Sequence, residues 1–312
     1  MRGAGRGRSD VVLMHRAQDA SRPHTPLPSQ RALPATANAH NARRLNEAPP
    51  NPPSHSLLPV ARRDDIVSFC DELLDPDAFS DYGPNGLQVP GAAEVTKVVT
   101  GVSAHRELIE RAVRSGAQML IAHHGLFWDF LPRALSEPMA ERLRIALDAQ
   151  LSVAGYHLPL DAHPAVGNNA LLCEALGFAR SLDEFARVRD RPIGVVGRSP
   201  EGVPAERLVE LVRELTEREP LVFATGPETV RSVGIVTGAG ASFVHEAVAL
   251  GLDALVTGEP AEHVMADARE GGLHFIAAGH YATETLGVRR LGELVAERFG
   301  VEHEFIPVPN PV

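Results

Sequence analysis

Cysteine is scarce in this chain of 312 residues. Cys70 and Cys173 are the only two, they stand in unrelated sequence contexts, and neither belongs to a CxxC pair. Small secreted folds that depend on disulfides show dense and regularly spaced cysteines. The sequence therefore predicts a fold that disulfides do not hold together.

Long apolar runs are also missing. The longest are strand-length pieces such as residues 118–122, whereas a membrane-spanning helix requires about 20 apolar residues. With 44% apolar residues the chain can still bury a large hydrophobic core. We expect a globular protein of the bacterial cytoplasm without a transmembrane span.

Two nucleotide-binding motifs and one motif of catalytic serine are absent. The sequence has no GxxxxGK[ST] phosphate loop, no GxGxxG after a predicted strand and no GxSxG elbow. The absence disfavours NTPases, dinucleotide enzymes and serine hydrolases. Gly238-Ala239-Gly240 follows a predicted strand and could cradle an anion, although a tight turn explains it equally well.

Positive charge is scarce outside the N-terminal region. Residues 1–60 carry eight arginines and three acids, which leaves 22 of the 30 basic and 37 of the 40 acidic residues for the rest, a formal charge of −15. Binding to the phosphate backbone of nucleic acids requires a surplus of cations. The composition therefore disfavours nucleic acid as a partner.

Residues 1–57 contain clustered prolines and little patterned hydrophobicity. Such a composition cannot offset the entropy lost on ordering. We predict a disordered extension here, which we interpret as an overextended gene start, with a transit peptide as the alternative. The apolar stretch 11–14 is too short for a secretory signal.

The region 58–312 alternates strand-like apolar runs with segments of helical period, which indicates an α/β fold with mixed, largely parallel sheets. Strands are predicted at 97–102, 118–122, 151–156, 233–237, 254–257 and 274–278, and a connecting region contains the apolar run 193–196. Helices are predicted at 64–74, 106–115, 138–149, 205–217, 243–250, 261–270 and 284–299. Segments 97–177 and 232–300 show the same order of motifs, so we predict an internal repeat and a ligand site in the cleft between two related halves.

Two adjacent imidazoles, His123 and His124, end one of the buried-looking strands. Ligand sites in α/β sheets gather beyond the carboxyl ends of strands, and Gly125 would allow both rings to converge. We predict that both bind metal. The alternative is that one ring caps the strand and the other faces solvent.

Each predicted half ends a strand with the same spacing of histidine and carboxylate: His157 with Asp161, and His280 with Glu284. Residues four apart share one face of a helix. Either pair alone could be a surface hydrogen bond, but their repetition suggests one shared cleft. Mixed nitrogen and oxygen ligands suit Zn, Fe, Mn or Ni rather than Ca or Mg.

Three imidazoles and two carboxylates suffice for two divalent ions if one carboxylate bridges them or water completes the shells, which suits hydrolytic catalysis. The predicted metal ligands are His123, His124, Asp161, His280 and Glu284. His157, Glu259 and His263 are candidates to orient the ligands, although the last two could simply begin a helix. The turn-rich loop 81–88 could line the cleft, and turn chemistry alone would also explain it.

Four blocks of residues resemble one known family. They are Pro84-Asn85-Gly86-Leu87-Gln88-Val89, the block 121–128 around His123-His124-Gly125, His157-Leu158-Pro159-Leu160-Asp161-Ala162 with Asn168-Asn169, and Gly279-His280-Tyr281-Ala282-Thr283-Glu284. From about residue 60 to 308 the chain resembles the NIF-three-like dinuclear metal-centre proteins, the GTP cyclohydrolase I type 2 homologues.

This resemblance implies a two-part α/β fold, a ring-like homohexamer and a dimetal site in each subunit. The family's five ligand positions fall on the five residues selected above. Leu158-Pro159 replaces the usual Thr-Asn, which concerns substrate contacts rather than ligands, and the ferredoxin-like insert of longer members is missing.

Three functions are compatible with these observations. The first is a metal-dependent hydrolase of a small nucleotide-like or pterin-like molecule, in which His157 moves a proton. The second is a non-catalytic assembly that binds metal or a partner protein, and the third is ring opening of GTP.

Overall fold

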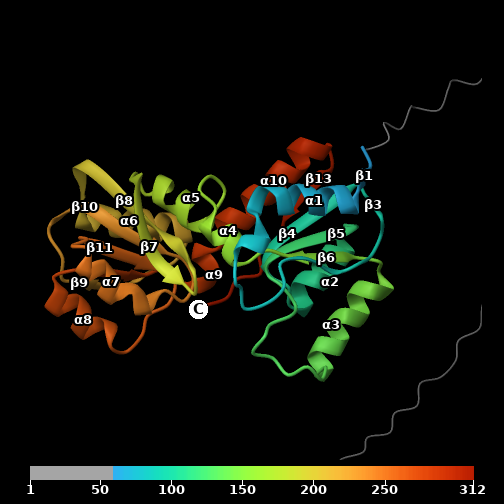
Figure 1. Ribbon diagram of the computed structural model, residues 1–312, viewed down its shortest axis with the longest axis horizontal. Helices are drawn as coiled ribbons and strands as arrows, with labels where there is room; N and C mark the ends of the chain where they lie inside the picture. Colours follow the sequence, from blue (N-terminus) through green and yellow to red (C-terminus); the bar gives the residue numbers. More distant parts are fainter. Residues whose placement is uncertain (1–58) are drawn as a thin grey trace, which may run out of the picture. The chain divides into compact units, whose positions relative to one another are not determined.

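The computed structural model describes residues 59–312, so the extension predicted for 1–57 lies outside the described residues. The described chain is α/β, as predicted, with one five-stranded and one six-stranded sheet and a short two-stranded ribbon of β1 (Ala61–Arg62) and β3 (Glu94–Val95) (Figure 1). None of the helices in residues 59–312 is both long and apolar enough to cross a membrane.

The five-stranded sheet is largely parallel. Its inner strands β4 and β5 are buried on both faces, which explains their continuous apolar sequences. Only β2 runs antiparallel, against β6. In order across the sheet, its strands are β13 (Glu302–Phe305), β4 (Lys97–Ser103), β5 (Met119–His124), β6 (Ser152–Gly155) and β2 (Gly86–Val89).

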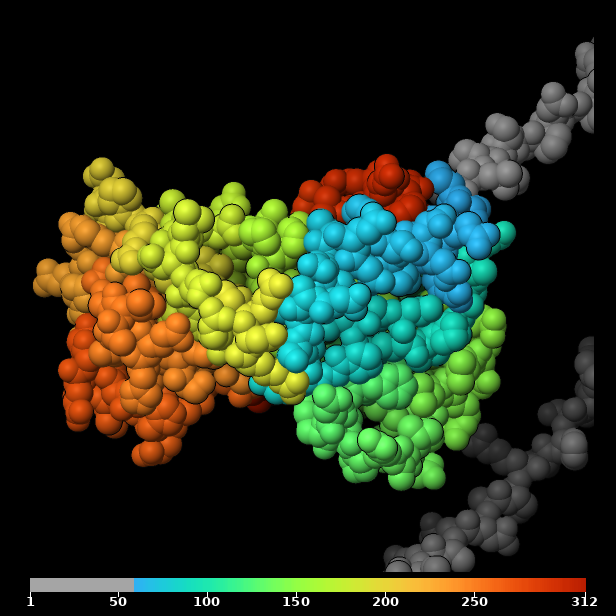
Figure 2. Space-filling view, viewed as in Figure 1, coloured from blue at the N-terminus to red at the C-terminus, as the bar shows by residue number. Residues whose placement is uncertain are grey.

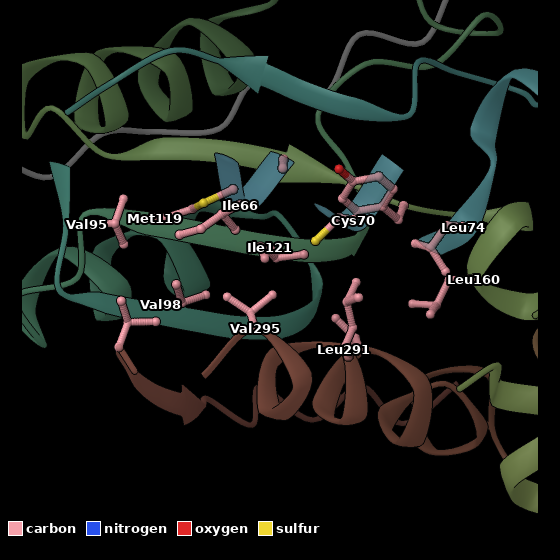
Figure 3. Close-up of a cluster of buried hydrophobic side chains, with 14 of the residues drawn as sticks. Ile66, Cys70, Leu74, Val95, Val98, Met119, Ile121, Leu160, Leu291 and Val295 are labelled. Atoms are coloured by element: carbon pink, nitrogen blue, oxygen red, sulfur yellow. The ribbon is translucent and has the colours of Figure 1, made fainter. Parts of the chain in front are cut away.

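Helices cover both faces of this sheet. On one face, α1 (Arg63–Leu74) and α10 (Thr285–Phe299) pack on the core shown in Figure 3, where Leu291 and Val295 meet Val98 and Ile121. On the other face lie α2 (Arg106–Arg114) and α3 (Glu137–Asp148). A three-layer arrangement therefore fixes the strand ends that carry His123 and His124.

The six-stranded sheet is mixed. Its three central strands β10, β11 and β12 are parallel, and the outer pairings are antiparallel. In order, its strands are β7 (Ala179–Val188), β8 (Arg191–Pro204), β10 (Thr229–Val236), β11 (Ala254–Thr257), β12 (His274–Ala277) and β9 (Leu221–Ala224). One face packs on α7 (Val244–Ala249) and α8 (Val264–Gly271), and the other on α5 (Asn168–Ala175) and α6 (Ala205–Thr216).

Short elements connect the two sheets. The helix α4 (Leu158–Ala162) places Leu160 in the core of the first sheet and Leu158 in the core of the second. The other short elements are α9 (His280–Thr283) and the 3-10 turns η1 (Pro76–Ala78) and η2 (Ala241–Phe243). Because α4 and α9 directly follow β6 and β12, they carry residues beyond the carboxyl ends of both sheets.

The hairpin of β7 and β8 also reaches back to the first part of the chain. Arg191 donates from Nε to the carbonyl of Ala78 at 2.9 Å, and its guanidinium lies over the Phe79 ring. Arg189 lies 4.6 Å from the centre of the Tyr82 ring. Figure 2 shows this yellow hairpin against the cyan segment. Cation–π contacts thereby hold the loop before β2.

The predicted helices and strands match the observed ones to within a few residues, with two main differences. The run 193–196 is noted in the sequence only as part of a connecting region, where the structure has the long hairpin β7–β8. The prediction also missed β2, β9 and β13, which pair with strands distant in sequence. The internal repeat stays a prediction, although each of its segments contains three adjacent parallel strands.

Both cysteines are buried and free. Burial, aided by the Asp71 carboxylate, raises the pKa of the Cys70 thiol to about 12, and burial raises the pKa of Cys173 to about 11. Thiolate is the reactive form, so we expect neither residue to react with Ellman's reagent at pH 8 in the native protein. Both should react in 6 M guanidinium chloride. Rapid labelling of the native protein would contradict the packing described here.

Candidate metal centre

His123 and His124 end β5, where the ring centres lie 4.7 Å apart. His123 is completely buried and His124 is largely buried. The chain turns at Gly125, where a Cβ atom would collide with the Gln88 side chain. Gln88 accepts a hydrogen bond from the Leu126 amide at 2.7 Å, so the close approach of this loop requires glycine. The turn that the sequence predicted is present.

Two carboxylates reach these rings from other parts of the chain. His123 Nε2 lies 3.5 Å from Asp161 Oδ2 and 3.7 Å from Glu284 Oε1. Glu284 Oε2 lies 3.2 Å from Nε2 of both His124 and His280. All five residues predicted as ligands therefore meet in one cluster, which combines β5 with α4 and with α9 and its C-cap.

The outer nitrogens of the three rings are held by the surrounding structure. His123 Nδ1 is 2.9 Å from the Tyr156 carbonyl, and His124 Nδ1 is 3.0 Å from Ser103 Oγ. His280 Nδ1 contacts Glu259 Oε1. The Tyr156 carbonyl and the Glu259 carboxylate can only accept hydrogen bonds. Nδ1 of His123 and Nδ1 of His280 must therefore carry the proton. In the neutral rings, Nε2 is then an unprotonated lone pair facing the carboxylates.

Lone pairs that face carboxylate oxygens repel them unless a cation lies between. Within residues 59–312, His123 Nε2 and Glu284 Oε2 are buried polar atoms with no hydrogen-bond partner. A buried unsatisfied polar atom costs about 1–3 kcal/mol. Metal ions or added protons would satisfy both atoms, and held Nδ1 atoms are typical of metal-binding histidines. The residues present therefore fit a metal centre.

Without metal, the cluster has strongly shifted pKa values. Burial lowers the pKa of His123, but the charges of Asp161 and Glu284 outweigh it and raise the value to about 9. Burial also lowers the pKa of His280, but Glu284, which would accept a hydrogen bond from Nε2 of the protonated ring, and Glu259 raise it to about 9. Burial holds the pKa of His124 at about 3. Glu284 stays ionised because the neighbouring histidines lower its pKa against the effect of burial.

The ligand atoms form two groups that share one residue. His123, Asp161 and Glu284 have ligand atoms within 4.8 Å of one another, and so do His124, His280 and Glu284. Each group has the mixture of nitrogen and oxygen that suits first-row transition metals. Glu284 belongs to both groups.

Asp161 is oriented by neighbours from the second sheet. Its Oδ1 accepts hydrogen bonds from Asn168 Nδ2 at 2.8 Å and from Thr237 Oγ1 at 3.3 Å. Asn169 Oδ1 in turn accepts from the Thr237 amide at 2.7 Å. Oδ2 is left to face His123. The Asn-Asn pair noted in the sequence thus positions the carboxylate rather than contacting the rings.

His157 lies beside the cluster, with its ring centre 5.2 Å from that of His123 and 5.5 Å from that of His124. Its Nδ1 is 2.7 Å from Asp81 Oδ1. Hydrogen bonding and charge from His157, with a further bond from Asn85, lower the pKa of Asp81 to about 2 despite burial. The sequence suggested that loop 81–88 lines the cleft but did not single out Asp81, because no local spacing links it to His157.

The two remaining candidates differ. Glu259 contacts His280 Nδ1, as expected for a residue that orients a ligand. His263 does not reach the cluster: its Nδ1 is 2.7 Å from Asp267 Oδ2, and its ring stacks on exposed His245. The expectation for His263 was wrong because this residue precedes α8 and pairs four residues along the helix, toward α7.

A pocket of about 460 Å³ opens beside the cluster. Aromatic side chains form much of its wall: the Trp128 ring stacks on Phe130 at 5.6 Å and meets the His157 ring edge to face at 5.0 Å. The lining residues are Tyr82, Ser103, Ala104, His105, His124, Gly125, Trp128, Phe130, Arg142, His157 and His280. The volume is in the range of small-molecule sites.

Gly238 offers a test of the cluster's tight packing. It belongs to a turn with φ of +67°, and an added Cβ would lie 2.4 Å from Glu284 Oε1 and 3.2 Å from His280 Nε2. We expect Gly238→Ala to displace Glu284 and to lower metal content severalfold, measured by elemental analysis.

The matched control is Gly251→Ala, since Gly251 has φ of +64° and no atom within 4 Å of an added Cβ. Both substitutions carry a similar backbone cost of about 1–2 kcal/mol. Equal metal contents of the two variants would contradict the contact at Gly238.

A family model and a curated relative both match most of this chain. The family model described as Duf34/NIF3 (NGG1p interacting factor 3) matches residues 61–311. A protein of Escherichia coli strain K12 with the name GTP cyclohydrolase 1 type 2 homolog is 42% identical over 248 residues, which cover 79% of this chain and 98% of that protein.

Solved structures show the same fold. One, titled protein ybgI of unknown function, superposes with a TM-score of 0.76 at 41% identity, over 81% of this chain and 100% of the other. The protein TTHA1606 from Thermus thermophilus gives a TM-score of 0.73 at 34% identity, with the same coverage of both chains.

Proposed function

The chain belongs to the Duf34/NIF3 family, and on that premise we propose that it holds two divalent metal ions and hydrolyses a small nucleotide-like or pterin-like substrate. One observation carries the proposal: Nε2 atoms of three buried or half-buried histidines face two carboxylates, and two of the buried atoms have no other partner within the described residues.

One ion would be held by His123, Asp161 and Glu284, and the other by His124, His280 and Glu284. Zn, Fe, Mn and Ni all suit this set of ligands. When bound, two such ions supply Lewis acidity and lower the pKa of water. The protein's part is to fix the ligands through the Tyr156 carbonyl, Ser103 and Glu259.

We assign proton transfer to His157. Asp81 accepts from its Nδ1 at 2.7 Å, and the Asn85 side chain accepts from its backbone amide at 2.8 Å. These bonds fix the ring at the pocket wall, and Nε2 is the nitrogen that would move the proton. A positioned imidazole of this kind contributes about 10²–10⁴-fold to proton-transfer reactions.

The aromatic wall of the pocket favours a flat, ring-containing substrate. Trp128 and Phe130 offer stacked ring faces, and Tyr82 adds a third aromatic side chain at the wall. Aromatic pairs prefer stacked or edge-to-face contact, which suits a purine or pterin ring. The substrate class in the proposal rests on this wall and on the pocket's volume.

The test is to load the purified protein with each metal and to screen nucleotides, phosphoesters and pterins for turnover. We expect hydrolysis of at least one compound, lost in His123→Ala and reduced about 10²-fold or more in His157→Ala with metal content retained. No turnover above the His123→Ala background with any metal would refute the enzymatic part. A non-catalytic assembly that binds metal would then be the remaining interpretation.

The name carried by the Escherichia coli relative favours a second candidate, ring opening of GTP. This reaction would release formate, so a formate assay with GTP as substrate tests it directly. We also propose a homohexamer, as the family resemblance implies. Native mass spectrometry of the purified chain would give the number of subunits.

A further inference from the structure

Arg142 is the only arginine that lines the pocket beside the metal cluster. It belongs to α3, and its Nε is buried without a hydrogen-bond partner among the described residues. A buried guanidinium N–H without an acceptor is costly, about 1–3 kcal/mol for each such group. The Arg142 Nε–H group therefore requires a hydrogen-bond acceptor that no described residue supplies.

Carboxylates on α3 and on the adjoining helix α2 already have partners. Glu141 pairs with Arg144 on the same helix, and Glu110 of α2 pairs with Arg106 at 2.7 Å. In residues 59–312, Arg142 forms no ion pair within 4.0 Å, although Arg144 of the same helix and Arg106, Arg111 and Arg114 of α2 do so. A cation that stays unpaired in an acidic protein, at the wall of a pocket, points to an anionic ligand.

His105 adds a second polar group to the same wall. Its Nδ1 accepts from the Leu108 amide at the start of α2, so in the neutral ring Nε2 carries the proton and is a donor. Burial lowers the pKa of His105, with a smaller contribution from the charge of Arg142, and both residues line the same pocket. Ser103 also lines this part of the pocket.

We propose that Arg142 and His105 form a subsite for the phosphate group of the substrate, so that the pocket takes a phosphorylated aromatic compound. The planar guanidinium presents paired N–H donors that match phosphate oxygens. The aromatic wall of Trp128 and Phe130 takes the ring, and the metal cluster lies at the same pocket. This inference deepens the proposed function and rests on it for the pocket's use, but the subsite itself needs no metal.

Trp128 is the only tryptophan in the chain, so its fluorescence reports on this pocket alone. The experiment titrates the full chain, kept metal-free in EDTA at low salt, with AMP, adenosine and ribose 5-phosphate. We expect AMP to bind about tenfold or more tightly than adenosine. Inorganic phosphate should compete with AMP but not with adenosine, and ribose 5-phosphate should bind weakly because it lacks a ring.

The decisive variant is Arg142→Gln, which should lower AMP affinity to the level of adenosine and leave adenosine binding unchanged. The matched control is Arg144→Gln, since Arg144 is an exposed arginine two residues along the same helix and already pairs with Glu141. This variant should bind AMP as the wild type does. Arg142→Lys keeps the positive charge but lacks the paired N–H donors of the guanidinium group. This variant should show an intermediate preference for AMP over adenosine.

The proposal is overturned if Arg142→Gln keeps the wild-type preference for AMP, if wild type shows no preference, or if Arg142→Lys loses adenosine binding together with AMP binding. Because the titration excludes metal, a loss of the phosphate preference does not depend on the metal centre. A protein that binds no metal but discriminates AMP from adenosine would refute the proposed hydrolase and leave the subsite intact.

Discussion

Glu284→Gln is expected to reduce metal content severalfold, from the two ions per chain that we propose to well below one. Glu284 is the only residue common to both groups of ligand atoms, and its Oε2 lies 3.2 Å from the ring nitrogens of His124 and His280. Glutamine keeps the shape but replaces one oxygen by an NH₂ group, which cannot bind a cation. Elemental analysis of the protein after dialysis against each metal measures the loss.

The matched control is Glu262→Gln, which removes an exposed carboxylate on the segment before α8 and should leave metal content unchanged. Glu259→Gln should give an intermediate result, because Glu259 orients His280 rather than contacting the metals. Loss of a residue that orients a ligand commonly lowers metal affinity about 10–100-fold. Wild-type metal content in Glu284→Gln would refute a centre built on this carboxylate.

Chelation is expected to produce the second large effect, a fall in thermal stability. Metal that binds only the folded chain stabilises it by about 3–4 kcal/mol when free metal exceeds the dissociation constant about 100–1,000-fold. For a chain of this size, the loss corresponds to about 10 °C in the unfolding temperature. Differential scanning fluorimetry with and without EDTA measures it, and Glu284→Gln should show no such change.

This stabilisation should depend on pH in a defined direction. In the metal-free cluster the pKa values of His123 and His280 are about 9, so both rings carry protons at neutral pH that metal must displace. Metal affinity therefore falls as the pH is lowered below 9. The difference in unfolding temperature between metal-loaded and EDTA-treated protein should be larger at pH 8.5 than at pH 6. The opposite order would contradict ligation through these rings.

The sequence predicted the composition of the candidate site well because its residues stand at strand ends. His123 and His124 follow a buried strand, and the pair His280 and Glu284 has helical spacing, so local patterns place them. Asp81 and Arg142 were not found. Their importance depends on contacts with His157 and with the pocket wall, which arise from packing between segments far apart in the sequence.

The fold was predictable to a similar extent. Strands β4, β5 and β6 are continuous apolar runs, and their helices have clear periodicity. In β7, by contrast, most residues are exposed and no alternation of polar and apolar side chains exists, so the pattern gives no signal. Local sequence patterns also do not indicate which strands pair with one another. The position of β13 beside β4 could therefore not be predicted.

That pairing has a consequence for biosynthesis. Glu284, α10 and β13 leave the ribosome after the entire six-stranded sheet, whereas β4 and the paired imidazoles of β5 leave early. Until then the nascent chain exposes an open strand edge and an uncovered apolar surface, which are features that recruit chaperones. We therefore expect metal uptake to be post-translational, and prematurely terminated chains to be degraded without ever acquiring metal.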